Sequence, residues 1–88
     1  MYKGYVYFIV DYKTNQVKIG YSKKPEQRLK QLKTGYPGKL EIAKTVPGNP
    51  TDEKKYQRVF CHDKICREWF RLSEEILEFI NRKIYYEK

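Results

Sequence analysis

Apolar and polar positions alternate near the start of the chain and predict two short strands. The segment Gly4–Val10 is rich in β-branched and aromatic residues on both faces, which is typical of a central strand covered on both sides. Val17–Tyr21 has a similar composition. Between them, Lys13-Thr14-Asn15-Gln16 supplies turn residues, and Asn15 is best suited to a left-handed backbone position. We therefore expect a β-hairpin.

Helical spacing follows the hairpin. Pro25 fits a first-turn position and Glu26 suits the positive end of the helix dipole, so a helix is expected to begin there. Leu29 and Leu32 provide its apolar stripe, and Gly35 is expected to end it.

A third strand is expected at Lys39–Val46, because apolar residues recur there at every second position. The residues assigned to one face are Leu40, Ile42, Lys44 and Val46. The sequence Pro47-Gly48-Asn49-Pro50 then favours a firm break in the chain.

Two further helices are expected in the C-terminal half. Asn49 or Thr51 can cap the first, with Asp52 and Glu53 in its first turn. Its apolar stripe is predicted to contain Tyr56, Val59 and Phe60, and His62–Arg67 to be a polar loop. Trp69, Phe70 and Leu72 are expected to return to the core, and Ser73 to cap a helix that buries Ile76, Leu77, Phe79, Ile80 and Ile84.

These segments predict a single small α+β domain over residues 1–88. The expected element order is β-β-α-β-α-α, with a three-stranded antiparallel sheet flanked by helices. A tail at Tyr85, Tyr86 and Lys88 is expected to fray.

Charge is concentrated in the first half of the chain. Residues 1–50 contain ten Lys or Arg and three Asp or Glu, a net charge of +7, whereas residues 51–88 contain nine and eight, a net charge of +1. A basic segment of this kind favours a polyanionic partner, with nucleic acid ahead of an acidic membrane or protein. A merely soluble basic protein is the alternative.

The sequence carries no apolar run near the ~20 residues that a membrane span needs. We also find no secretory signal, so a cytoplasmic location and reduced cysteines are expected. Cys61, His62 and Cys66 lie close together, but this spacing matches no familiar zinc finger. Two partly buried thiols and a loop histidine are the preferred interpretation.

The predicted hairpin assembles groups that suit a phosphate. Tyr5 and Tyr7 share one face of the first strand, and Lys18 and Gly20 share one face of the second. The following helix can place Arg28 over them. A phenol, an ammonium and a guanidinium around one glycine are suited to binding a phosphate group.

The same stretch resembles the signature of the GIY-YIG nuclease superfamily. Tyr5-Val6-Tyr7 stands where that family has Gly-Ile-Tyr, and Lys18-Ile19-Gly20 stands where it has Tyr-Ile-Gly. Arg28 falls at the family's helical arginine, Glu53 resembles its metal-binding glutamate, and Glu68-Trp69-Phe70 resembles a motif of one branch. That branch is the small domain known from phage proteins and a meiotically up-regulated yeast gene. The resemblance spans roughly Gly4 to Ile80.

The resemblance implies a GIY-YIG-like fold and a Mg²⁺- or Mn²⁺-dependent endonuclease that hydrolyses phosphodiester bonds, with DNA favoured over RNA. It implies catalytic roles for Tyr7, Lys18, Arg28 and Glu53, with Glu53 as the metal ligand. Residues that can contact nucleic acid are Tyr5, Tyr21, Lys23, Lys24, Lys30, Lys33 and Tyr36, and Tyr12 could also stack on an unpaired base. Two further candidates are Gln57 and Glu68. Glu68 could line the site or pair with Arg67 or Arg71.

Two departures from the family pattern bear on activity. Lys18 replaces the tyrosine of the older pattern, although Lys-Ile-Gly is common at this motif in the branch. A lysine cannot act as a phenolic base, but Tyr21 could supply a second phenol. Branch members often have a histidine where this chain has Gln57. The alternatives are therefore a catalytically inactive nucleic-acid-binding module on the same fold, or a small protein-interaction adaptor. With one domain, sequence specificity is expected to be low or supplied by a partner protein.

Overall fold

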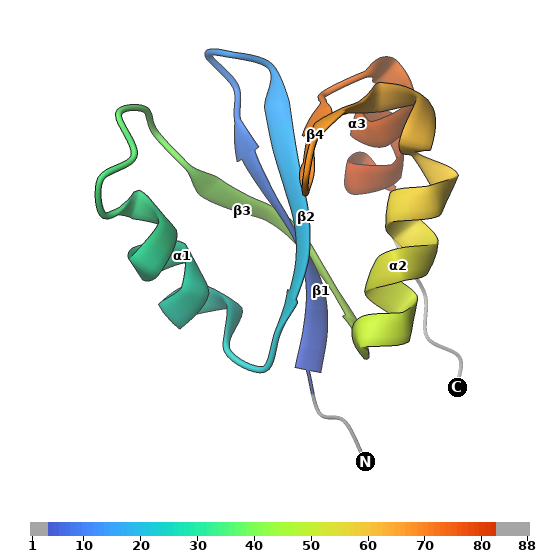
Figure 1. Cartoon of the computed structure of the whole chain (residues 1–88), viewed down its shortest axis with the longest axis horizontal. Coiled ribbons are helices and arrows are strands. Elements are labelled where there is room, and N and C mark those ends of the chain that lie inside the picture. Colours follow the sequence, from blue (N-terminus) through green and yellow to red (C-terminus); the bar gives the residue numbers. More distant parts are fainter. Residues whose placement is uncertain (1–3, 83–88) are drawn as a thin grey trace.

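A twisted five-stranded sheet with helices on both faces forms the domain in the computed structural model, which describes residues 4–82 (Figure 1). The strands are β1 (Gly4–Asp11), β2 (Gln16–Ser22), β3 (Glu41–Gly48), β4 (Lys64–Cys66) and β5 (Trp69–Arg71). The helices are α1 (Pro25–Lys33), α2 (Pro50–Val59), the short 3₁₀ helix η1 (Cys61–Asp63) and α3 (Glu74–Asn81). The sheet order is β3-β1-β2-β5-β4, and every pairing is antiparallel.

The α+β prediction is confirmed, but the expected three-stranded sheet is wrong. The additional strands come from segments that the sequence suggested were a loop and a return to the core. Part of the expected polar loop is β4, which pairs with β5, and β5 extends the sheet beside β2. Both strands have only three residues, too few for an alternating pattern to identify them.

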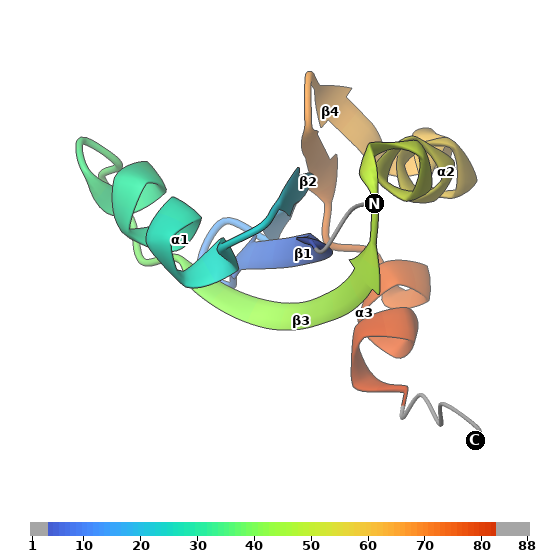
Figure 2. The same cartoon turned by 90° about the horizontal axis from the view of Figure 1, so that it is seen from below.

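Helix α1 covers one face of the sheet, and α2 and α3 cover the other (Figures 1 and 2). Alternation along β1 divides the core accordingly. Val6, Phe8 and Val10 pack toward α2 and α3, whereas Tyr7 and Ile9 pack toward α1. The prediction of a central strand covered on both faces is confirmed.

Strand β3 departs from simple alternation because it contains a bulge opposite Phe8 and Ile9. Ile42 therefore packs on the α1 side, whereas Val46 packs on the α2 and α3 side. The expectation that these residues share one face is wrong. Strand β3 also continues through Pro47 to Gly48, and Pro47 is tolerated because β3 is an edge strand.

The helix ends agree with the sequence. Pro25 begins α1, and Gly35 adopts φ +80° just after α1 ends. Asn49 caps α2 through a reciprocal capping box with Asp52, and Ser73 caps α3 by accepting a hydrogen bond from the Ile76 amide. Asn15 has φ 58°, as expected for the hairpin turn.

Three details of burial correct the sequence expectations. Val59 is 60% exposed, so the buried stripe of α2 reduces to Tyr56 and Phe60. Cys61 and Cys66 are both exposed thiols and not partly buried ones. The predicted burial of Ile84 and the expected fraying of Tyr85, Tyr86 and Lys88 fall outside the described residues. Within residues 4–82, no helix is long and apolar enough to span a membrane.

Candidate nuclease site at the open edge of strand β2

Tyr7 and Gly20 lie directly opposite each other on β1 and β2. Tyr7 is 1% exposed, and its phenol occupies the space above Gly20, where an added Cβ would overlap the hydroxyl. Only glycine leaves room for this ring to lie across β2. The Tyr7 hydroxyl therefore reaches toward the far edge of β2.

That edge of β2 is left open by β5. Strand β5 pairs with β2 only from Gln16 to Lys18, and the last backbone bond runs from the Ile19 amide to the Glu68 carbonyl at 3.0 Å. The Ile19 carbonyl instead accepts a hydrogen bond from Gln57 Nε2 on α2, at 2.9 Å. A helix side chain thus occupies the position that a longer β5 would take.

Glu53 lies one turn before Gln57 on α2, and Gln57 Nε2 donates a second hydrogen bond to Glu53 Oε2 at 3.3 Å. The spacing of four residues places both side chains on one helix face. Gln57 therefore connects the Glu53 carboxylate to the edge of the sheet. From the sequence, Gln57 was a further candidate and a departure from a family pattern, but its bond to the Ile19 carbonyl could not be predicted.

Lys18 forms an ion pair with Glu68, with Nζ 3.0 Å from Oε1. The ammonium also lies over the Trp69 ring, 5.6 Å from its centroid, and the Lys18 side chain is only 12% exposed. The suggested pairing of Glu68 with Arg67 or Arg71 is wrong, since Arg71 pairs with Asp63. Glu68 does line the site, as the sequence also suggested.

The charges of these groups act on one another. Burial raises the pKa of Tyr7 above its ordinary value; a hydrogen bond and the charge of Arg28 lower it, and the charges of Glu68 and Glu53 raise it further. The net shift of the Tyr7 pKa is upward. The phenol is therefore protonated at neutral pH in the free protein.

Glu53 also has a raised pKa. Burial is the main cause, the negative charge of Glu68 adds to it, and the charges of Lys54 and Lys18 oppose it. Two carboxylates from different elements thus lie close enough to repel each other. The structure brings together all four residues for which catalytic roles were predicted, together with Gln57 and Glu68, and their roles stay predictions.

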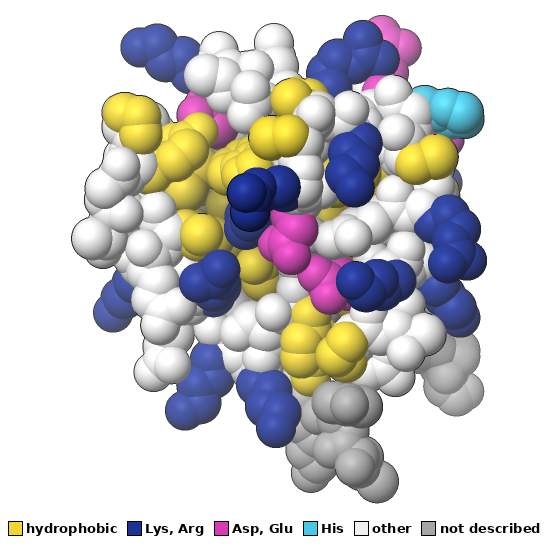
Figure 3. Space-filling model, in the orientation of Figure 1, with side chains coloured by type: hydrophobic (Ala, Val, Ile, Leu, Met, Phe, Trp, Pro, Cys, Tyr) yellow, Lys and Arg dark blue, Asp and Glu magenta, His cyan; other side chains and the backbone are white. Residues whose placement is uncertain are grey.

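The residues predicted to contact nucleic acid lie outside the group formed by the four predicted catalytic residues with Gln57 and Glu68. On the face shown in Figure 3, acidic side chains near the middle are surrounded by lysine and arginine side chains. The exposed lysines among the predicted contacts are Lys23, Lys24, Lys30 and Lys33, and Tyr5 is 39% exposed. Tyr21 lies on the opposite face from Tyr7, with its phenol against Gly4, so it is not placed to supply the second phenol beside Tyr7.

Tyr36 is held by contacts with other residues of the domain. Its hydroxyl donates to Asp11 Oδ2 at 2.6 Å, and its ring stacks on Trp69 with 5.9 Å between centroids. Asp11 is almost fully buried, which the sequence did not indicate for a charged residue beside a turn.

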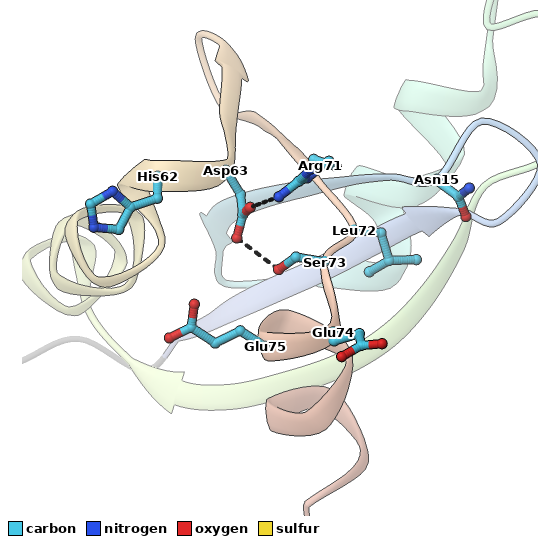
Figure 4. A pocket seen from close by; sticks show the side chains of 8 residues that line it. All are labelled: Asn15, His62, Asp63, Arg71, Leu72, Ser73, Glu74 and Glu75. Atoms are coloured by element: carbon cyan, nitrogen blue, oxygen red, sulfur yellow. Dashed lines mark hydrogen bonds and ion pairs between the residues drawn. The ribbon is translucent and has the colours of Figure 1, made fainter.

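A separate depression of about 660 Å³ lies beside α3 and contains none of the predicted site residues (Figure 4). Its centre is Asp63, which accepts hydrogen bonds from Arg71 at 2.9 Å and Ser73 Oγ at 2.7 Å. Burial raises the pKa of Asp63, but these two hydrogen bonds and the charges of Arg71 and His62 outweigh it and lower the pKa overall. The arrangement connects η1, β5 and α3, and we assign it a structural role.

No group of three or more His, Cys, Asp or Glu side chains suited to a metal occurs within residues 4–82. Mg²⁺ is commonly held by one or two carboxylates, with water and substrate phosphate oxygens completing its coordination. Glu53, with Glu68 beside it, is enough to meet this requirement of one or two carboxylates.

The fold and this group of residues define a small α+β domain with a polar, charged site at a sheet edge. The chain belongs to the T5orf172 domain family, whose sequence model matches residues 4–84. The family is associated with phage proteins of GIY-YIG-like and homing-endonuclease type and suggests a nuclease-like or DNA-binding role. No curated protein and no solved structure matches the chain.

Proposed function

We propose that this protein is a Mg²⁺- or Mn²⁺-dependent endonuclease that hydrolyses phosphodiester bonds in DNA. The observation that carries the proposal is the convergence of Tyr7, Arg28 and Glu53 from three different elements on the open edge of β2. A carboxylate whose pKa is raised by burial and by a second carboxylate is typical of functional sites, and here it lies beside Tyr7 and Arg28.

In this proposal Glu53 holds the metal ion. Its carboxylate is partly buried and repelled by Glu68, and a divalent cation relieves both costs. When bound, such an ion polarises a phosphoryl oxygen and neutralises charge that develops on it. Gln57 orients Glu53 through its hydrogen bond.

Tyr7 and Arg28 act on water and phosphate. Tyr7 is protonated in the free protein, so it first loses its proton to solvent. The water oxygen then bonds to phosphorus as the bond to the leaving oxygen breaks. The water proton passes to the Tyr7 phenolate, and the leaving oxygen takes a proton from solvent. Because Arg28 lowers the pKa of Tyr7, Arg28 favours that form and can also bind phosphate oxygens. Lys18 is held by Glu68, and we assign it the role of balancing the two carboxylates.

The test is a cleavage assay on labelled single-stranded and duplex DNA, with Mg²⁺, Mn²⁺ or a chelator. We expect metal-dependent products from the wild type and a loss of about 10²–10⁴-fold in rate for Tyr7→Phe. Glu53→Gln should lose activity at all practical metal concentrations. Glu75→Gln is the matched control, because Glu75 also lies in the first turn of a helix but is exposed and away from the site.

A catalytically inactive binding module is the second candidate. Two observations favour it. Lys18, the cation of the Lys18-Ile19-Gly20 motif, is already paired with Glu68. The raised pKa of Tyr7 also disfavours the phenolate that would act as the base. This candidate predicts salt-sensitive DNA binding without products under any metal condition. Wild-type binding without cleavage on both strand forms would select it over the nuclease.

A further inference from the structure

The end of the β-hairpin and the segment between α1 and β3 enclose a groove away from the candidate nuclease site. A depression of about 530 Å³ lies between Tyr12 and Lys13 on one side and Pro37, Gly38 and Lys39 on the other. A second depression of about 440 Å³ shares Gly38 and Lys39 and continues to Lys33 at the end of α1. We call the two together the hairpin groove.

The hairpin groove has a fixed wall. Buried Asp11 accepts hydrogen bonds from the Lys13 amide at 2.9 Å and the Thr14 amide at 3.2 Å, which fixes the turn. Its other oxygen accepts the Tyr36 hydroxyl at 2.6 Å, which fixes the opposite segment. Gly38 approaches so closely that an added Cβ would lie 2.7 Å from Asp11 Oδ2. One carboxylate thus joins both sides, so the groove exists before any ligand arrives.

The chemistry of the hairpin groove suits an unpaired nucleotide. Tyr12 is 51% exposed and offers an aromatic ring at the mouth of the groove. Lys13, Lys33 and Lys39 are exposed along it, whereas Glu41 is the one exposed carboxylate among the lining residues. An exposed aromatic ring flanked by lysines stacks on a base while the lysines contact phosphates. Bases inside a duplex have both faces covered, so a duplex cannot use the ring in this way.

We propose that the hairpin groove binds single-stranded DNA, with one unpaired base stacked on Tyr12 and the neighbouring phosphates at Lys13 and Lys39. The inference deepens the proposed nuclease function, on which it rests for the identity of the polymer. It makes single-stranded DNA, or a single-stranded region beside a duplex, the preferred substrate.

The experiment measures binding separately from cleavage. All variants are made in the Glu53→Gln background and tested without divalent metal, so that no substrate is consumed. Fluorescence anisotropy gives the dissociation constant for a labelled oligothymidine and for a duplex of equal length at the same salt concentration. The matched control is Ile65→Ala, because Ile65 is also 51% exposed but lies on β4.

Tyr12→Ala is expected to weaken single-strand binding by about 5- to 150-fold, the range of one base–aromatic stack, and to change duplex binding by less than about two-fold. Tyr12→Phe should retain the affinity for the single strand. Lys39→Ala should weaken binding and reduce the slope of log K against log salt by about 0.7, the value for one phosphate contact on a single strand.

Two results would overturn the inference. One is an unchanged single-strand affinity in Tyr12→Ala; the other is an equal loss on single strand and duplex. Failure of the wild type to cleave DNA in the earlier assay would refute the nuclease but leave this binding comparison intact. Failure of the Glu53→Gln protein to bind either strand form would refute the groove proposal, whereas the nuclease proposal depends on the cleavage assay alone.

Discussion

Tyr7 on β1 lies directly across from Gly20 on β2, and its phenol fills the space that any side chain at position 20 would need. The glycine is therefore tied to the tyrosine by packing as well as by backbone pairing. This relationship explains why a strand otherwise rich in large residues contains a glycine at that point.

Gly20→Ala should displace the Tyr7 hydroxyl and lower the cleavage rate by about 10- to 1000-fold, since a misplaced acid–base group loses most of its contribution. The neighbour of the new methyl group is the far end of the tyrosine ring, which can move, so the loss of stability should be modest. Cleavage rates and thermal unfolding of the two proteins check this prediction.

Gly35→Ala provides the contrasting control. Gly35 has φ +80° and nothing within 4 Å of an added Cβ, so the substitution strains the backbone without touching the site. We expect about 1 kcal/mol of lost stability and an unchanged cleavage rate. A Gly20→Ala protein that cleaves like Gly35→Ala would refute the role given to the Tyr7–Gly20 contact.

Glu68→Gln should move the acid limb of the pH–rate profile to lower pH. The charge of Glu68 adds to the burial effect that raises the pKa of Glu53, so its removal lowers that pKa and leaves Glu53 ionised at lower pH. The substitution also frees Lys18, which acts in the same direction. Profiles of kcat/KM at one fixed Mg²⁺ concentration below saturation measure the shift, with Glu78→Gln as the exposed control. A limb that stays in place or moves upward would contradict the assignment.

Gln57→Leu should raise the Mg²⁺ concentration needed for half-maximal activity several-fold. The leucine keeps the volume but removes the amide that bonds both Glu53 and the Ile19 carbonyl, so Glu53 loses its orientation. Ile19 is fully buried, so its carbonyl also loses a partner, and the free energy of unfolding should fall by about 1–3 kcal/mol. Metal titration of the cleavage rate, beside Val59→Ala on the same helix, distinguishes this outcome from a general loss of packing.

Asp63→Asn should lower the free energy of unfolding by about 1–3 kcal/mol at neutral pH, because hydrogen bonds to a buried charged acceptor are lost. The folded-state pKa of Asp63 is below its unfolded value. Its contribution is therefore fully present above the unfolded pKa of about 4 and is lost as the pH falls through the folded pKa. Denaturant titrations should show wild type and variant converging at low pH. A constant difference across the acid range would indicate that the charge of Asp63 is not involved.

The local elements were predictable because their determinants are adjacent in sequence. Asn15 in the turn, Pro25 at the start of α1, Asn49 capping α2 and Ser73 capping α3 all act over a few residues. The three-residue strands β4 and β5 were not predictable, because they exist only through pairing with β2. The bulge in β3 likewise depends on the register against β1.

The candidate site likewise has a part that could be predicted from the sequence and a part that could not. The sequence by itself determined an ordered set of candidate site residues, Tyr7, Lys18, Arg28 and Glu53, of which the first three lie in the basic half of the chain. Only the tertiary structure decided that Lys18 pairs with Glu68, that Gln57 caps the open edge of β2, and that Tyr36 is held by Asp11 while Tyr12 stays exposed. Periodicity fixes the face on which a side chain lies. The residue that this side chain contacts depends on which distant segments pack against the same face, and the arrangement of the whole sheet decides this.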